Sequence, residues 1–384
     1  MLRFHQGAIF CLATLLASPA SGPAFAGTFK VLHAFQGGPD GTNPAAPLTW
    51  VGGKLYSTTL YGGTGGYGTA YLVNKKGKEN TLYPFTDLAD GGDPFSSLTE
   101  LNGVLYGTTS SGGAHSQGTI FSLTPDGKEA VLYSFTGPAD GRFPLSGLVT
   151  MDGVLYGATA AGGDGSCNGG SGCGVVFSLT PGGTFSTVYR LSNDSGWFVS
   201  ANLLPVHGTL YGTAPSGGAN GAGTVFSVTP KGNLKVLYSF SGGADGAAPV
   251  ASLTRVRNVF YGTTQSGGTY GEGVAFSLTP SGTQTVLHSF GSGTDGAQPE
   301  SALTLLDGKF YGTTNSGGAY SGGTIFSITT SGAEIVERSL NGLDGIFPNA
   351  GLIAHKGVLY GNTYVGGDDN CNSHGCGTVF SYIP

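Results

Sequence analysis

The chain has 384 residues and a formal net charge of −6, and 10% of its residues are charged, against roughly 25% in an average globular protein. It has no basic stripe and no long apolar run after the N-terminus, so the sequence predicts no nucleic-acid partner, no binding to an anionic membrane surface and no membrane insertion. The 72 glycines recur at fixed intervals, which indicates ordered turns rather than disorder.

Residues 1–26 have the pattern of a secretory signal peptide. Arg3 supplies a positive charge, the run from Ala8 to Ala17 is too short to span a bilayer, and Ala24-Phe25-Ala26 forms an A-x-A cleavage site. We therefore expect cleavage after Ala26 and an exported protein, periplasmic or extracellular. The mature chain, residues 27–384, is predicted to be a single domain.

A repeat of about 50 residues fills this domain, a length typical of β-propeller blades. Its parts read L-Y-G-T-T-x-x-G-G, then G-T-I-F-S-L-T-P-x-G, then V-L-Y-S-F, then D-G-x-x-P. The tyrosines of the first part are Tyr56, Tyr106, Tyr156, Tyr211, Tyr261, Tyr311 and Tyr360. The seven copies predict an all-β fold, a seven-bladed β-propeller of four-stranded antiparallel blades.

Each repeat contains four strand-like runs, here named A to D. In the second repeat they are Ser96–Leu101, Val104–Thr109, Thr119–Thr124 and Ala130–Phe135, rich in β-branched and aromatic residues and separated by turn residues. In such a meander the B–C and D–A connections emerge on one face, which we name the top face.

The seventh repeat lacks a D run, because the chain ends just after strand C. A D-type run, Lys30–Phe35, instead precedes the first repeat. We therefore expect the N-terminal strand to complete the last blade and close the ring, which leaves only short protected edges.

The B–C loops of the third and seventh repeats are longer than the others. From the tyrosine of strand B to the aromatic residue of strand C there are 15 residues in five repeats, but 21 in the third and 20 in the seventh. Each insertion carries a cysteine pair, which in an exported chain predicts the disulfides Cys167–Cys173 and Cys371–Cys376. A metal site is the alternative, since His374 lies inside the second pair, but the spacing matches no zinc pattern.

Departures from the repeat on the top face are the candidate binding residues. The loop into the fourth repeat replaces D-G-x-x-P with a stretch that contains Trp197 and Phe198, and an aromatic side chain there suits a sugar ring or a partner, although Trp197 could instead pack into the neighbouring blade. The other candidates are Arg142 on a D–A loop and the B–C loop tips Tyr67, His115, Asn220, Tyr270 and Tyr320.

A second set of residues repeats in nearly every blade. The D-G-x-x-P aspartates are Asp40, Asp90, Asp140, Asp245, Asp295 and Asp344. A ring of carboxylates could bind cations or a sugar, but an aspartate before glycine usually caps its own turn, and we favour that structural role.

Weak candidates for catalysis are Asp93, His115, Glu272 and Glu300, which lie outside the repeat pattern. A glycosidase needs two carboxyl groups roughly 5 to 10 Å apart, and a lyase could use a histidine with a tyrosine. There is no G-x-S-x-G or H-E-x-x-H motif. The sequence predicts no cofactor and no metal site.

The repeat motifs resemble the bacterial tandem repeat called GloVer (Gloeo/Verruco type), found in "choice-of-anchor" exported proteins. The resemblance covers residues from about 28 to 384, since all copies keep both motif and spacing. It implies an exported, β-propeller-like array, often followed by a surface anchor. It supplies no catalytic residues.

The expected function is a monomeric binding or interaction module that holds a polysaccharide or protein ligand with its top-face loops. One alternative is a polysaccharide lyase or glycoside hydrolase with its site at the top of the channel. The other is a purely structural surface module.

Overall fold

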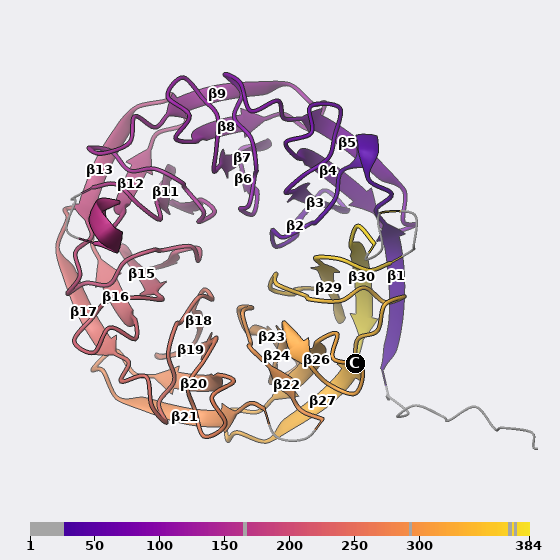
Figure 1. Cartoon of the computed structure of the whole chain (residues 1–384), viewed down its shortest axis with the longest axis vertical. Coiled ribbons are helices and arrows are strands. Elements are labelled where there is room, and N and C mark those ends of the chain that lie inside the picture. Colours follow the sequence, from indigo (N-terminus) through magenta and orange to yellow (C-terminus); the bar gives the residue numbers. More distant parts are fainter. Residues whose placement is uncertain (1–26, 164–166, 292–293, 368–370, 372–374) are drawn as a thin grey trace, which may run out of the picture.

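The computed structural model describes residues 27–163, 167–291, 294–367, 371 and 375–384. In this part of the chain, seven four-stranded antiparallel sheets surround a central channel, and the helical content is two single turns, η1 (Gly38–Asp40) and η2 (Asn168–Gly170) (Figure 1). The predicted seven-bladed propeller is confirmed. The predicted signal peptide lies outside the described residues. Among the residues described, no helix is long and apolar enough to cross a membrane.

Each blade runs from a three-residue strand at the channel to a longer strand at the rim. The strands, in the order A to D, are β2 (Thr49–Val51), β3 (Lys54–Thr59), β4 (Thr69–Asn74) and β5 (Glu79–Pro84) in blade 1; β6 (Thr99–Leu101), β7 (Val104–Thr109), β8 (Thr119–Leu123) and β9 (Glu129–Ser134) in blade 2; β10 (Val149–Met151), β11 (Val154–Ala158), β12 (Val175–Leu179) and β13 (Phe185–Arg190) in blade 3; β14 (Leu204–Val206), β15 (Thr209–Ala214), β16 (Thr224–Val228) and β17 (Leu234–Ser239) in blade 4; β18 (Thr254–Val256), β19 (Val259–Thr264), β20 (Val274–Leu278) and β21 (Gln284–Ser289) in blade 5; β23 (Thr304–Leu306), β24 (Lys309–Thr314), β26 (Thr324–Ile328) and β27 (Glu334–Ser339) in blade 6; and β28 (Ile353–His355), β29 (Val358–Thr363), β30 (Thr378–Ile383) and β1 (Thr28–Ala34) in blade 7.

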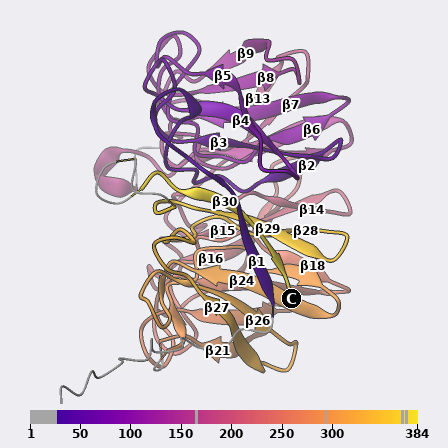
Figure 2. The same ribbon diagram turned by 90° about the vertical axis from the view of Figure 1, so that its right-hand side faces the viewer.

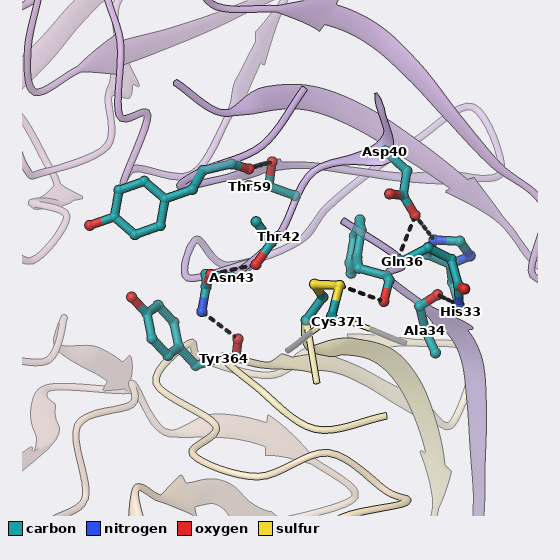
Figure 3. Close-up of a disulfide and its surroundings, with 12 residues drawn as sticks. His33, Ala34, Gln36, Asp40, Thr42, Asn43, Thr59, Tyr364 and Cys371 are labelled. Carbon is teal, nitrogen blue, oxygen red and sulfur yellow. Dashed lines mark hydrogen bonds and ion pairs between the residues drawn. A yellow bond between two sulfur atoms is a disulfide. The ribbon is translucent and has the colours of Figure 1, made fainter. Parts of the chain in front are cut away.

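The N-terminal strand closes the ring as predicted. Strand β1 pairs antiparallel with β30, with Thr28 opposite Ile383 and Ala34 opposite Thr378 (Figure 1). Figure 3 shows the top of this seam, where the amide of Asn43 donates to the carbonyl oxygen of Tyr364 at 3.2 Å. Both chain ends therefore contribute to one blade.

Strand A is shorter than the sequence predicts. In blade 2 it begins at Thr99 rather than at Ser96. The hydroxyl of Ser96 lies 2.7 Å from that of Thr108, and the Ser96 carbonyl oxygen accepts from Thr58 of the preceding blade at 3.3 Å. Hydrogen bonds to side chains therefore replace the β-sheet hydrogen bonds at Ser96, and the chain stays extended along the channel wall.

Neighbouring blades are joined by the same contacts around the ring. In most blades a threonine of strand B donates to a backbone carbonyl oxygen of the next blade, as Thr108 does to Pro144 at 3.0 Å and Thr213 does to Ala251 at 2.9 Å. Aromatic residues of strand D and the next strand C also meet, as Phe240 and Phe276 do with ring centroids 5.3 Å apart. The hydrophobic core therefore lies between blades.

The top face is further tied by short pairings between D–A and B–C loops. One of them is a two-stranded sheet, β22 (Gly296–Ala297) with β25 (Ser316–Gly317), and other blades have single bridges such as Arg142 with Ala161. Figure 2 shows η2, in the blade 3 insertion, projecting from this face. The variable top-face loops are therefore held in place by backbone pairings that recur in most blades.

Both predicted disulfides are confirmed. Cys167 is bonded to Cys173 and Cys371 to Cys376, with Cα–Cα distances of 5.0 and 5.3 Å, and all four side chains are buried. The sulfur of Cys371 lies 3.8 Å from the carbonyl oxygen of Phe35, so the blade 7 insertion rests on the ring seam (Figure 3). His374, the residue of the metal alternative, lies outside the described residues.

Candidate functional site

The upper part of the channel holds a cavity of about 380 Å³. One position of the repeat, the residue that follows the proline of D-G-x-x-P or its replacement Val199, contributes a lining side chain from every blade. These residues are Ala45, Phe95, Leu145, Ser200, Val250, Glu300 and Asn349. Every D–A connection enters the channel at the same height, so a single repeat position forms a ring.

This ring is chemically two-sided. Blades 1 to 3 supply the apolar residues Ala45, Phe95 and Leu145, whereas blades 6 and 7 supply Glu300 and Asn349. Among the described lining residues, Glu300 is the only one with an ionisable side chain. The cavity therefore has an apolar wall opposite a polar one.

Glu300 is held by side-chain amides. Its Oε1 accepts from Nε2 of Gln265 at 2.5 Å, and its Oε2 is 3.5 Å from Nδ2 of Asn315, which also donates to Oδ1 of Asn349 at 2.5 Å. Burial raises the pKa of Glu300, and the hydrogen bonds from Gln265 and Asn315 oppose this shift only in part. The polar wall is thus a fixed row of amides around one carboxyl group.

A second repeat position, the residue before the proline or before Val199, has a left-handed backbone in every blade. Its members all have φ between 51° and 67°, and they are Asn43, Asp93, Phe143, Phe198, Ala248, Gln298 and Phe347. The N–H of Phe143 donates to Gln117 at 3.1 Å and its carbonyl accepts from Ala160 at 3.0 Å, which connects two loops. A bulky residue is strained at positive φ. Three phenylalanines nevertheless occupy this position, and Phe198 also lines the cavity.

Asn202 is a site residue that the sequence analysis missed. Its Nδ2 donates to Oγ of Ser97 at 2.8 Å and its Oδ1 accepts from the N–H of Gly147 at 2.7 Å, which joins blades 2, 3 and 4. Ser97 and Asn202 line both this cavity and the space below it, so the bridge forms part of the cavity floor. The available signal was an asparagine at a repeat position where other blades have small residues or proline.

Trp197 packs into the protein, as in the alternative weighed above. It is half-buried against the cluster that contains Cys167, Cys173 and Val199, and its indole Cδ1 would be 2.8 Å from a Cβ at Gly217. The adjacent Phe198 is 38% exposed and lines the cavity. Of the predicted aromatic pair, only Phe198 contributes a surface to this site.

Two of the predicted polar binding residues support loops. Nη2 of Arg142 donates to the carbonyl oxygen of Ser171 at 2.8 Å and so holds the blade 3 insertion. Nδ2 of Asn220 donates to the carbonyl oxygen of Phe240 at 3.1 Å. The remaining predicted binding residues are exposed at separate loop tips and do not line the cavity; they are Tyr67, His115, Tyr270 and Tyr320.

The four catalytic candidates do not gather around the cavity, since only Glu300 lines it. The carboxylate of Asp93 accepts from Oγ of Ser111 at 2.9 Å, and burial raises its pKa, with a smaller effect from the charge of Asp87. The side chain of Glu272 lies along Gly291, and His115 is exposed. No second carboxyl group is among the described lining residues.

Four of the repeated aspartates, Asp40, Asp90, Asp140 and Asp245, cap their turns as favoured from the sequence, whereas Asp344 pairs with Arg338. Asp245 accepts from the N–H of Ser241 and from the hydroxyl of Tyr238, both at 2.8 Å. Burial alone would raise the pKa of Asp245, but these hydrogen bonds outweigh it and lower the pKa. Two of the six have histidine partners, Asp40 with His33 and Asp295 with His288.

Comparison with known proteins gives a family and a fold. The model of the Gloeobacter/Verrucomicrobia repeat matches residues 6–171 and 165–380. No curated protein matches the chain. A protein provisionally assigned as a 6-phosphogluconolactonase from Bacteroides uniformis is similar in structure, with 15% identity, a TM-score of 0.50 and coverage of 76% of this chain and 85% of its own. A gluconolactonase from Xanthomonas campestris has 15% identity, a TM-score of 0.44 and coverage of 76% and 87%. At such identities the likeness extends to the fold alone.

Proposed function

The chain belongs to the Gloeobacter/Verrucomicrobia repeat family, and we propose that it is an exported, monomeric binding module that holds a carbohydrate at the upper end of its channel. The disulfides agree with an oxidising compartment. The observation that carries the proposal is the two-sided cavity, with an apolar wall that includes Phe95 opposite a polar wall around Glu300.

These two walls match the chemistry of a sugar ring. A pyranose has an apolar face that packs on aromatic side chains and a rim of hydroxyls that hydrogen-bonds to amides and carboxylates. Phe95 and Phe198 supply the first kind of surface, and Glu300, Gln265 and Asn349 supply the second. A volume of about 380 Å³ lies within the range of small-molecule sites.

The polar side chains of the site already have hydrogen-bond partners without a ligand. Glu300 is fixed by Gln265 and Asn315, and the floor is fixed by the Asn202 bridge. Side chains that are already ordered lose little conformational entropy on binding. The strain of Phe198 at φ 67° is consistent with a residue kept for its exposed ring rather than for its backbone preference.

A polysaccharide lyase or glycoside hydrolase is the second candidate. The observation in its favour is the raised pKa of Glu300, which suits a general acid. Against it stands the single carboxyl group among the described lining residues, since retaining and inverting glycosidases use two. We therefore favour binding without turnover.

The test is affinity electrophoresis of the mature protein through native gels that contain plant, algal or microbial polysaccharides. The variants Phe198→Ala and Glu300→Gln should weaken retardation by about tenfold, or about 1.4 kcal/mol. Alanine is compatible with this backbone, because Ala248 occupies the same repeat position with φ 53°. The matched control is Tyr270→Ala, an exposed aromatic residue on a loop tip away from the cavity lining.

The outcomes separate the candidates. Retardation without loss of polymer, lost in the two cavity variants and kept in Tyr270→Ala, supports the proposal. A cleared zone that disappears in Glu300→Gln would replace it with the enzyme. Retardation that is lost only in Tyr270→Ala would move the site to the loop tips, and no retardation in any gel would favour a structural module or a protein partner.

A further inference from the structure

We propose that the outer rim between blades 5 and 6 carries a binding site for a divalent transition-metal ion of the zinc class, formed by His288, Asp295 and Glu334. His288 lies in β21, Asp295 in the loop that follows it and Glu334 at the start of β27, the neighbouring rim strand (Figure 1). One ligand atom from each residue lies within 4.8 Å of the other two. An ion there would join the outer strands of two blades.

The three side chains offer a suitable donor set. Nε2 of His288 is 2.9 Å from Oδ2 of Asp295, and their side chains are 24% and 9% exposed. Zinc binds imidazole nitrogen and carboxylate oxygen at about 2.0–2.2 Å, so donors around one ion are separated by about 3–4 Å. Small side-chain rotations would therefore bring the donor atoms to coordination distance, and water would complete the coordination shell. The imidazole favours zinc over magnesium or calcium, which prefer oxygen ligands.

A second observation also favours a cation at this position. Oε1 of Glu334 is buried and has no hydrogen-bond partner; the same is true of Glu129 at the equivalent position of blade 2, but there Tyr83 stands in place of the histidine, so that rim lacks a nitrogen donor. Two carboxyl groups here face a single imidazole, and Arg338 on the same strand as Glu334 is engaged with Asp344, to which it donates at 2.7 Å. A buried carboxylate oxygen without a partner is costly, and a bound cation would satisfy it.

The protein's own repeats show what the rim looks like without these ligands. Between blades 4 and 5 the corresponding residues are Tyr238, Asp245 and Gln284. There the tyrosine hydroxyl donates to the aspartate at 2.8 Å, and the Gln284 amide donates to the Asp245 carbonyl oxygen at 3.2 Å. That arrangement is closed by hydrogen bonds, whereas histidine and glutamate at the same positions leave a set of metal donors.

A similar set at the seam is less well formed. His33 and Asp40 are 3.5 Å apart, but the carboxylate of Glu79 accepts from the hydroxyl of Thr81 at 3.0 Å. We therefore assign one site, at blades 5 and 6, and expect one ion per chain.

The test is isothermal titration of the mature, metal-free protein with ZnCl₂, with MgCl₂ as the contrast. Wild type should bind one zinc ion and melt at a higher temperature with zinc than without it, as expected when a ligand binds only the folded state. His288→Tyr and Glu334→Gln each introduce a residue that the rim already has between blades 4 and 5, so both should fold. Each should weaken zinc binding by at least about tenfold and abolish the zinc-dependent rise in Tm.

The control is His115→Ala, which removes an exposed imidazole elsewhere and should leave zinc binding unchanged. No zinc binding by wild type would overturn the proposal. So would an isotherm that is the same in His288→Tyr and Glu334→Gln as in wild type, because the ion would then be bound elsewhere. A response to magnesium as strong as that to zinc would overturn the assignment of the metal class.

Discussion

Glu129, at the rim between blades 1 and 2, occupies an unfavourable position. Its Oε1 is buried and has no hydrogen-bond partner. Burial and the charge of Asp90 raise its pKa from 4.5 to about 7. The folded state therefore retains a proton that the unfolded state releases between these two values, and the free energy of unfolding falls as the pH rises through that window.

Replacing this residue should stabilise the protein above pH 7. Glu129→Gln removes the buried charge and introduces the residue that blade 5 has at this position, Gln284. We expect a rise in Tm on the order of 1–2 °C at pH 8 and little change at pH 4, measured by thermal unfolding at both values. Asp152→Asn, a change at an exposed turn, is the control and should show no such pH dependence. An equal change in Tm at both pH values would contradict the raised pKa of Glu129.

The sequence located the irregular acids but could not tell which of them reaches the channel. Asp93 directly precedes a proline and Glu300 directly follows one. The position before the proline has a left-handed backbone, φ 51° at Asp93, and the Asp93 carboxylate bonds to a loop serine, whereas the position after the proline places Glu300 on the cavity wall. The partners of Glu300 come from two blades, Gln265 from one and Asn315 from the next. Contacts of this kind depend on the angle between blades, which no local pattern encodes.

At the scale of strands and loops, close contacts explain why glycine recurs just before strand C. Gly223 has φ 100°, and a Cβ there would lie 2.5 Å from Cδ of Pro249 and 2.6 Å from the carbonyl oxygen of Ala214. The glycine is needed because the proline of the next D–A loop rests on it. Gly377 and Pro44 make the same contact across the seam, at 2.6 Å.

Two glycines of one loop should therefore respond differently to alanine. Gly223→Ala should lower the free energy of unfolding by about 2–4 kcal/mol, because backbone and proline must shift. Gly221→Ala, two residues away, has φ 77° but nothing within 4 Å of its added Cβ. Gly221→Ala should therefore lower the free energy of unfolding by about 1 kcal/mol, which is the cost of backbone strain alone. Urea unfolding of both variants measures the difference, and similar losses would refute the packing argument.

Strands B, C and D were predictable because runs rich in β-branched and aromatic residues are bounded by turn residues, as in β7 and β9. The prediction made strand A too long, because the residues around Ser96 have the composition of a strand. Its hydrogen-bond partners are the side chains of Thr108 and Thr58, and Thr58 belongs to another blade. Local propensity cannot register a partner that comes from the next repeat.

At the scale of the whole molecule, closure gives the seam the same kind of contact as an interface between internal blades. Phe35 of the N-terminal segment is fully buried and meets Tyr71 of blade 1 with ring centroids 5.0 Å apart. Phe240 and Phe276 make the corresponding contact between blades 4 and 5 at 5.3 Å. A repeat array that is open at its ends would instead have a weak terminal interface.

If the interfaces are alike, removing the same side chain from two of them should lower the free energy of unfolding by similar amounts. Phe35→Ala and Phe240→Ala should each lower the free energy of unfolding by about 3–5 kcal/mol, since both remove a fully buried phenyl ring from the same contact. Denaturant unfolding followed by tryptophan fluorescence is a direct measurement, because Trp50 packs near the seam and Trp197 lies in the cluster between blades 3 and 4. If the ring is closed, the fluorescence of Trp50 and that of Trp197 should change in a single unfolding transition in both variants. A much smaller loss for Phe35→Ala, or an early separate change that leaves the rest of the ring folded, would mean that the N-terminal strand is only loosely attached and that the blades stand without a closed ring.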